Sequence, residues 1–193
     1  MTKQVRIVAI SGSSRVGSTN TQLLRSIAKM APKNVDIEIL SGLEKLPFYS
    51  EDLESHNLPT EIVALREKVS AADAVLIATP EYNYSYTGLV KNTIDWLSRP
   101  YAKGVLAGKP VAITGASLGA FGTVRAQAHL RQVLHGTNSK VVNRPEVYVG
   151  SAHEKFGEDD DFLDASGRAM LLELLDNLID LAADVNGSEM LAS

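Results

Sequence analysis

The 193-residue sequence contains no cysteine, only one tryptophan and no long hydrophobic run. The absence of cysteine excludes disulfides, thiolate catalysis and cysteine-ligated metals, and it is consistent with a reducing compartment. No stretch approaches the ~18 apolar residues of a membrane-spanning helix, and the N-terminus lacks the pattern of a signal peptide. We therefore expect a cytoplasmic protein without a membrane span.

An excess of basic residues is also missing, because 19 Lys and Arg stand against 23 Asp and Glu, for a formal net charge of −4. Proteins that bind nucleic acid or an anionic membrane surface carry a basic patch, so we expect neither partner. The length suits one domain with a substantial core. We expect that domain to cover residues 1–185, with a frayed tail at 186–193.

Short apolar runs alternate with longer segments of helical period, which predicts βαβ units and a parallel sheet buried on both faces. The expected strands are Val5–Ser11, Val35–Leu40, Ala74–Thr79, Pro110–Thr114 and Glu146–Val149. The expected helices are Asn20–Met30, Pro59–Ala71, Gly88–Ser98, Gly122–His135 and Phe162–Ala183. Right-handed crossovers of these lengths favour an α/β, flavodoxin-like three-layer sandwich with strand order 2-1-3-4-5. Ligands bind such folds at the carboxyl ends of strands 1 and 3, where the chain reverses direction.

A glycine-rich and hydroxyl-rich loop, Ser11 to Asn20, follows the first strand and leads into a helix. Its short donors and its one guanidinium come from Ser13, Ser14, Ser18, Thr19, Asn20 and Arg15. Together with the positive helix end, these groups predict a phosphate site. The alternative is an ordinary turn in which Ser18 or Thr19 caps the helix. Neither G-x-x-x-x-G-K-[ST] nor G-x-G-x-x-G is present, which argues against a P-loop nucleotidase and a dinucleotide fold.

Two further loops follow strands at the same expected edge of the sheet. Pro80, Glu81, Tyr82 and Asn83 follow the third strand and present amides that suit the polar edge of a flat heteroaromatic ring. The alternation of Tyr82, Tyr84 and Tyr86 would equally mark one face of an extended segment. The fourth strand leads into a glycine-permissive loop with Ser117, Leu118 and Gly119, which is either a third wall or a plain connection.

Four motifs, in this order along nearly the whole chain, resemble those of the NADPH-dependent FMN reductases of flavodoxin-like fold. They are Gly12-Ser13-x-Arg15-x-x-Ser18-x-Asn20, Pro80-Glu81-Tyr82-Asn83-x-Ser85, Lys91-Asn92-x-Ile94-Asp95-Trp96-x-Ser98-Arg99 and Arg125-Ala126-Gln127-x-x-Leu130-Arg131. This family includes quinone, azo-dye and chromate reductases. The sequence departs from its pattern at Ser14, where the family usually has leucine, and we expect this change to keep the phosphate site.

The resemblance implies a non-covalent FMN and a co-substrate that is NADPH or NADH. It places the FMN phosphate at Ser13, Arg15, Ser18, Thr19 and Asn20, with Ser14 as an added donor, and the ring between two walls formed by Pro80, Glu81, Tyr82, Asn83 and by Ser117, Leu118, Gly119. The flavin carries the hydride, so no side chain is named as an obligatory acid or base, and water or Tyr82 supplies protons.

The implied second substrate is a small-molecule electron acceptor, namely a quinone, an azo or nitro compound, chromate or free flavin. The pattern of its helix makes Trp96 either a core residue or a subunit-interface residue. The resemblance also implies a homodimer or homotetramer, with Trp96 and its helix in the contact region. A flavodoxin-type electron carrier is the alternative function, although such carriers are usually more acidic. A receiver-type signalling domain lacks support, because no acidic pair follows the first strand.

Two other charged features have simple interpretations. Arg125 and Glu146 would meet across a subunit contact or remain an exposed pair. The acidic run from Glu158 to Asp161 is expected to complement the positive end of the last helix.

Overall fold

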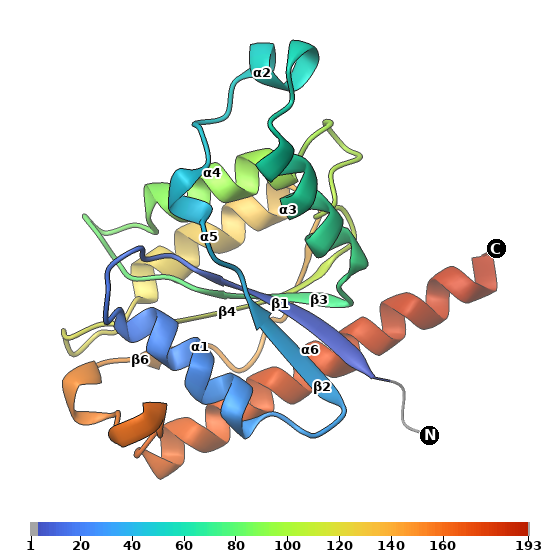
Figure 1. Cartoon of the computed structure of the whole chain (residues 1–193). Helices are drawn as coiled ribbons and strands as arrows, with labels where there is room; N and C mark the ends of the chain where they lie inside the picture. Colours follow the sequence, from blue (N-terminus) through green and yellow to red (C-terminus); the bar gives the residue numbers. More distant parts are fainter. Residues whose placement is uncertain (1–3, 193) are drawn as a thin grey trace.

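A parallel sheet forms the centre of the structure (Figure 1), a computed structural model that describes residues 4–192. Its strands are β1 (Val5–Ser11), β2 (Val35–Ile39), β3 (Ala74–Ala78), β4 (Pro110–Ala116), β5 (Lys140–Val141) and β6 (Val147–Val149). Their order is β2-β1-β3-β4-β5, with β6 also paired to β4. The predicted flavodoxin-like order is therefore confirmed, and β1 and β3 lie side by side at the point where the chain reverses direction.

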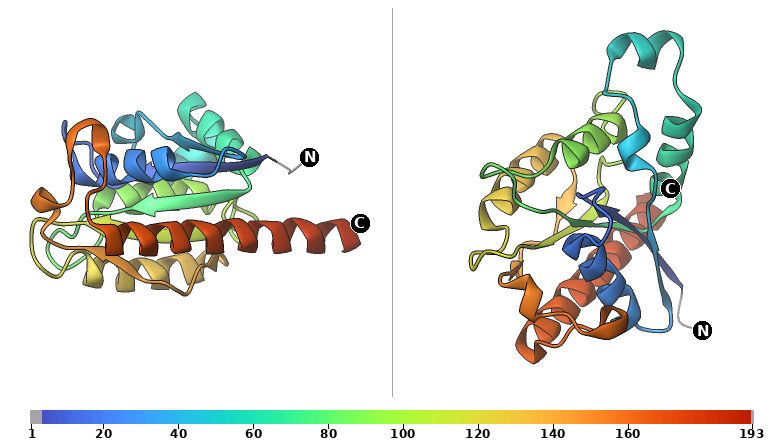
Figure 2. Two further views of the ribbon diagram at one scale, coloured as in Figure 1. Left: turned by 90° about the horizontal axis from the view of Figure 1, so that it is seen from below. Right: turned by 60° about the vertical axis from the view of Figure 1, so that its left-hand side comes forward.

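Helices cover both faces of this sheet, which explains why its central strands are continuous apolar runs. The helices are α1 (Thr19–Met30), α2 (Glu51–His56), α3 (Thr60–Ala71), α4 (Gly88–Leu97), α5 (Val124–Gly136) and α6 (Ala165–Ala192). Helices α1 and α6 pack on one face, and α3, α4 and α5 pack on the other (Figure 2). Short 3-10 turns occur at η1 (Leu43–Lys45), η2 (Ala152–Glu154) and η3 (Glu158–Asp160).

The fifth position of the sheet differs from the prediction of one strand at Glu146–Val149. Two short strands occupy it: β5 pairs with the amino end of β4 and β6 with the carboxyl end. Pro145 lies in the segment between them and has no backbone N–H, so a continuous ladder through this segment would lack a donor.

Three further segments refine the sequence-based picture. The polar connection at residues 50–59 contains α2, which has no buried residue and therefore no apolar period to indicate it. Helix α6 begins at Ala165, later than the predicted start at Phe162. It continues to Ala192 and so includes most of the expected tail, whose last residue, Ser193, lies outside the described part of the chain.

The acidic run before α6 does not complement the end of that helix. Instead, the side chains of Asp160 and Asp161 pair with Arg25 and Lys29 of α1. The first-turn N–H groups of α6 donate to Asp164, which is the residue directly before the helix. The expected role of the acidic run is wrong because α6 begins only at Ala165, and the electrostatic field of a helix end weakens beyond the first turn.

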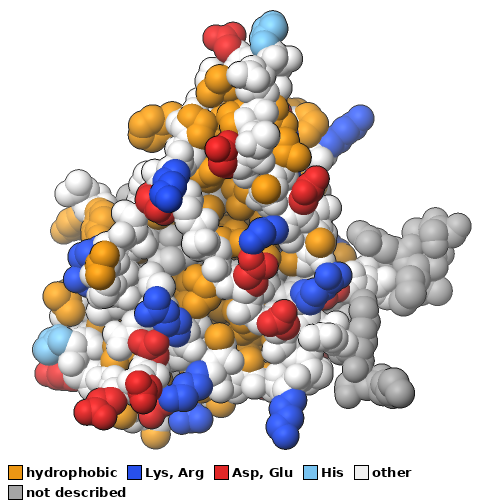
Figure 3. Space-filling view, viewed as in Figure 1, with side chains coloured by type: hydrophobic (Ala, Val, Ile, Leu, Met, Phe, Trp, Pro, Cys, Tyr) orange, Lys and Arg blue, Asp and Glu red, His pale blue; other side chains and the backbone are white. Residues whose placement is uncertain are grey.

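Trp96 on α4 is fully buried within its own chain, where its Nε1 donates to the carbonyl oxygen of Pro47 at 2.8 Å. The core alternative for Trp96 is therefore confirmed, and the expected role of its side chain in a subunit contact is wrong, because it has no exposed surface. The surface of the face seen in Figure 3 intersperses acidic and basic side chains, in keeping with the small net charge. Within residues 4–192, no helix combines the length and apolarity that are needed to cross a bilayer.

Candidate active site

The three candidate loops all leave the carboxyl edge of the sheet, away from the start of β1 and the end of α6 (Figure 2). The backbone of the first loop is tied directly to β3, because the N–H of Gly12 donates to the carbonyl of Ala78 at 2.7 Å. A Cβ on Gly12 would lie 3.0 Å from Pro80 Cδ and 2.9 Å from a methyl group of Val90. Glycine is therefore required here for the loop after β1 and the loop after β3 to approach each other closely.

The first loop ends in a capped helix. The hydroxyl of Ser18 accepts a hydrogen bond from the N–H of Thr21 at 3.3 Å, so the capping interpretation of Ser18 is confirmed. Ser14 and Arg15 are exposed, and the guanidinium of Arg15 donates to the carbonyl of Gly17 at 2.9 Å. In the part of the chain that the structure describes, Arg15 makes no ion pair within 4 Å, so its positive charge is available to an anion.

Asn20 joins the first loop to the end of β4. Its side-chain Nδ2 donates to the carbonyl of Ala116, and its Oδ1 accepts from the N–H of the same residue, both at 2.9 Å. Both residues are buried. One side chain thus satisfies two buried backbone groups and fixes the separation between the loop after β1 and the loop after β4.

The loop after β3 is a tight hairpin rather than an extended segment. Tyr82 and Ser85 exchange backbone hydrogen bonds at 2.9 and 3.0 Å across a two-residue turn. The turn residues, Asn83 and Tyr84, have positive φ angles of 49° and 67°, which is the backbone of a type I′ turn. Tyr82 and Tyr84 are 55% and 66% exposed, whereas Tyr86 packs partly against the core, so the three tyrosines do not share one face.

Glu81 is the one carboxylate in these loops, and helix α5 holds it. Its Oε2 accepts from the backbone N–H groups of Arg125 and Ala126 at 2.9 and 3.1 Å, and its Oε1 accepts from the Arg125 guanidinium at 2.8 Å. Burial alone would raise the pKa of Glu81, but these hydrogen bonds outweigh it and lower the pKa. Glu81 is therefore a carboxylate at neutral pH.

The loop after β4 is anchored to β6 and exposes apolar side chains, those of Leu118 and Phe121. The N–H of Ser117 donates to the carbonyl of Val149 at 2.9 Å, and the hydroxyl of Ser117 accepts from the N–H of Gly119 at 3.1 Å. Leu118 between them is largely exposed. The loop thus has a fixed backbone with apolar side chains at the edge of the sheet.

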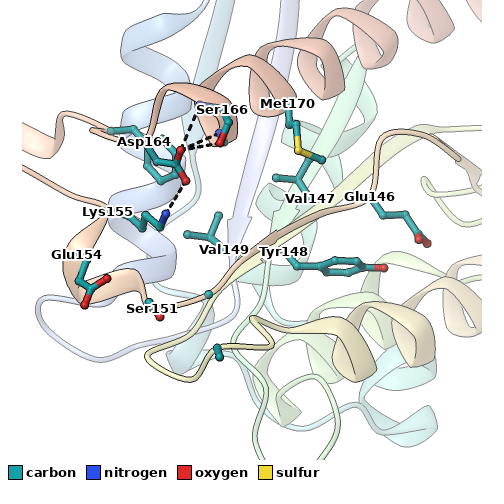
Figure 4. Close-up of a pocket in the computed structure, with 14 residues that line it drawn as sticks. Glu146, Val147, Tyr148, Val149, Ser151, Glu154, Lys155, Asp164, Ser166 and Met170 are labelled. Carbon is teal, nitrogen blue, oxygen red and sulfur yellow. Dashed lines mark hydrogen bonds and ion pairs between the residues drawn. The ribbon is translucent and has the colours of Figure 1, made fainter.

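Two cavities border these loops. One of about 360 Å³ lies beside the first loop and is lined by Ser13, Ser14 and Arg15. A larger one of about 440 Å³ lies between β6 and the start of α6 (Figure 4) and includes none of the predicted site residues. Lys155, the one cation among its lining residues, already donates to Asp164 at 2.6 Å. The first cavity is therefore the one with free phosphate-binding groups.

Sequence reasoning missed the partner of Arg125 and the role of Thr87. Arg125 pairs with Glu81, while Glu146 pairs with Arg131 at 3.3 Å, so the expected pair of Arg125 with Glu146 is wrong within the chain. The buried hydroxyl of Thr87 donates to the carbonyl of Gly12 at 2.7 Å. A threonine directly before a helix is a capping signal, and it could have directed attention to this residue.

The strand order and the helices on both faces of the sheet define a flavodoxin-like α/β protein, with three candidate loops at the carboxyl edge of the sheet. The family model described as NADPH-dependent FMN reductase matches residues 5–154. The chain belongs to this family.

Individual relatives agree with this assignment. The NAD(P)H-dependent FMN reductase PA1204 of Pseudomonas aeruginosa is 42% identical over 178 residues, which cover 92% of this chain and 95% of the relative. A quinone reductase of Escherichia coli (strain K12) is 40% identical over 156 residues, 80% of this chain and 82% of the relative. The solved structure of FerB, a flavoenzyme NAD(P)H:(acceptor) oxidoreductase from Paracoccus denitrificans, has a TM-score of 0.86 at 32% identity and covers 93% of this chain and 98% of its own.

Proposed function

We propose that this protein oxidises NADH or NADPH and passes two electrons, through a non-covalently bound FMN, to a quinone. The observation that carries this proposal is the junction of three loops at one edge of the sheet, tied together by Asn20 and by the close approach at Gly12. The chain belongs to the family of NADPH-dependent FMN reductases, and relatives named quinone reductases cover most of its length.

The residues of the crevice have the chemistry that FMN needs. The phosphate would be held by the first loop, where the charge of Arg15 and the start of α1 favour an anion. Donors for this group would be the hydroxyls of Ser13, Ser14, Ser18 and Thr19 and the backbone N–H of Asn20, because the Asn20 side chain is bonded to Ala116. The flavin ring would lie between the hairpin with Pro80, Glu81, Tyr82 and Asn83 and the loop with Ser117, Leu118 and Gly119.

The chain contributes position rather than acid or base chemistry. When bound, FMN supplies the group that accepts a hydride and delivers electrons. The paired backbone of the hairpin and the anchored backbone of the loop after β4 would orient the ring before any substrate arrives. The half-exposed Tyr82 is the side chain that would deliver a proton to a product at the mouth of the crevice. Azo compounds, nitro compounds, chromate and free flavin are further acceptors that an open crevice would admit.

A second copy of the chain would complete the crevice in a homodimer or homotetramer. The mouth exposes large apolar side chains, those of Tyr82, Tyr84, Leu118 and Phe121, and exposed apolar clusters of this kind are typical of contact surfaces. This surface replaces the buried Trp96 side chain in the proposed contact, and the remainder of α4 stays part of the proposal. Light scattering of the FMN-loaded protein gives the oligomeric state, and a monomer at all concentrations would contradict the assembly.

The test of the function is to load the purified protein with FMN and follow the absorbance of NADH and NADPH, with and without a quinone. The expected result is nicotinamide oxidation that requires the protein, FMN and the quinone. Retention of FMN without any nicotinamide oxidation would favour the electron-carrier alternative. Protein that stays colourless after incubation with FMN would contradict both functions.

A further inference from the structure

Helix α5 begins without a side-chain cap of its own. Thr123 stands at its N-cap position, but its hydroxyl makes no capping hydrogen bond and accepts instead from Gln127. The first-turn N–H groups of Arg125 and Ala126 donate to Glu81, which lies 44 positions before Arg125 in the chain. The cap of α5 is therefore supplied by the hairpin that follows β3.

The same hairpin is attached to α5 a second time, at its tip. The guanidinium of Arg125 donates to Glu81 and lies 4.1 Å from the centre of the Tyr84 ring, a cation–π contact. Glu81 is at the root of the hairpin and Tyr84 is in its turn. One arginine thus links both ends of the hairpin to the helix.

The hairpin depends on its contacts with α5 because it is short and mostly exposed; a further link is formed by Ser85, whose Oγ lies 3.1 Å from Nδ1 of His129 on α5. Only two backbone hydrogen bonds close it, and both Tyr82 and Tyr84 are mostly exposed. A short two-stranded hairpin is at best marginally stable in water without additional packing. Both carboxylate oxygens of Glu81 are engaged by α5, and the Glu81 side chain is only 11% exposed. This leaves the backbone of the hairpin, rather than the Glu81 side chain, to contact a ligand.

We propose that Glu81 is a positioning residue of the flavin site: by capping α5 and anchoring Arg125, it holds the hairpin as a rigid wall for the ring. This inference rests on the proposed function, because it concerns the FMN crevice. It assigns to Glu81 a role through α5 instead of a direct side-chain contact with the flavin.

The experiment compares E81Q with the native protein and with E54Q. Glu54 is a matched control, because its carboxylate is 15% exposed, accepts from Arg66, Arg99 and Tyr49, and lies on α2, outside the three loops. Fluorescence titration measures FMN affinity, and amide hydrogen exchange of the FMN-free protein measures opening at Arg125 and Ala126. We expect E81Q to weaken FMN binding about tenfold and to speed exchange at both amides. E54Q should lower thermal stability while leaving FMN affinity within about twofold of the native value.

A third variant, R125Q, separates positioning from direct contact. If Glu81 acts through α5, R125Q also weakens FMN binding, and the double variant is less impaired than the product of the two single effects. The proposal is overturned if E81Q binds FMN like the native protein, or if it weakens FMN while R125Q and the exchange at α5 remain unchanged. Failure of the native protein to bind FMN is visible before any variant is made and would instead overturn the proposed function.

Discussion

Removal of the Asn20 side chain should test whether the loop after β1 and the loop after β4 act as one site. In N20A, the N–H and the carbonyl of Ala116 would both lose their partner in a region where Ala116 is 1% exposed. An unsatisfied buried backbone group costs about 1–3 kcal/mol, so the two together should cost about 3 kcal/mol. For a chain of this size, that loss corresponds to a decrease of about 6–12 °C in Tm.

The matched control is N92A, because Asn92 makes the same kind of double contact elsewhere. Its Oδ1 accepts from the N–H of Tyr49 at 2.8 Å, and its Nδ2 donates to the carbonyl of Pro47 at 2.9 Å. The Pro47 carbonyl keeps a second donor, Trp96 Nε1, so N92A should cost less, about 1–2 kcal/mol. Thermal denaturation by circular dichroism gives both values.

FMN titration of the folded variants then separates stability from site geometry. N20A should bind FMN about tenfold or more weakly. Without the Asn20 side chain, the proposed phosphate-binding loop after β1 and the loop after β4 are no longer held at a fixed distance. N92A should bind FMN like the native protein. Equal FMN affinity in N20A and the native protein, at a temperature where both are folded, would refute the reasoning.

Two further predictions concern the charges of the structure. R15A should lose about 1.5–3 kcal/mol of FMN binding energy in a fluorescence titration, and the exposed-arginine variant R144A should lose none, so equal affinities in the two would remove Arg15 from the site. In denaturant unfolding at neutral pH, D164N should lose about 1 kcal/mol, because hydrogen bonds from Lys155, Ser166 and Gly167 lower the pKa of Asp164. This stabilisation is complete above the unfolded-state pKa of about 3.9 and is lost as the pH falls further through the lower native pKa, so a pH-independent difference would contradict it.

Features that depend on local pattern could be predicted from the sequence. The runs Val5–Ser11 and Ala74–Ala78 are apolar on both faces, and the helical periods between them are regular, so the parallel sheet and its order follow. Glycine and hydroxyl residues directly after β1 likewise indicate an anion-binding loop from chemistry that is local in the chain. Pro145, by contrast, divides the last strand through one missing donor within a region that otherwise has strand-like composition.

The sequence by itself therefore determined the class of fold, the edge of the sheet at which the three candidate loops lie and the residue types available there. Only the tertiary structure decided which of these groups are free and which are already used. Glu81 bonds to α5, Asn20 to Ala116 and Asp160 to α1, and each of these partners is remote in the chain. Hydrogen-bond acceptors such as carboxylates and amides fit many donors equally well, so their choice of partner is settled by packing and not by local sequence.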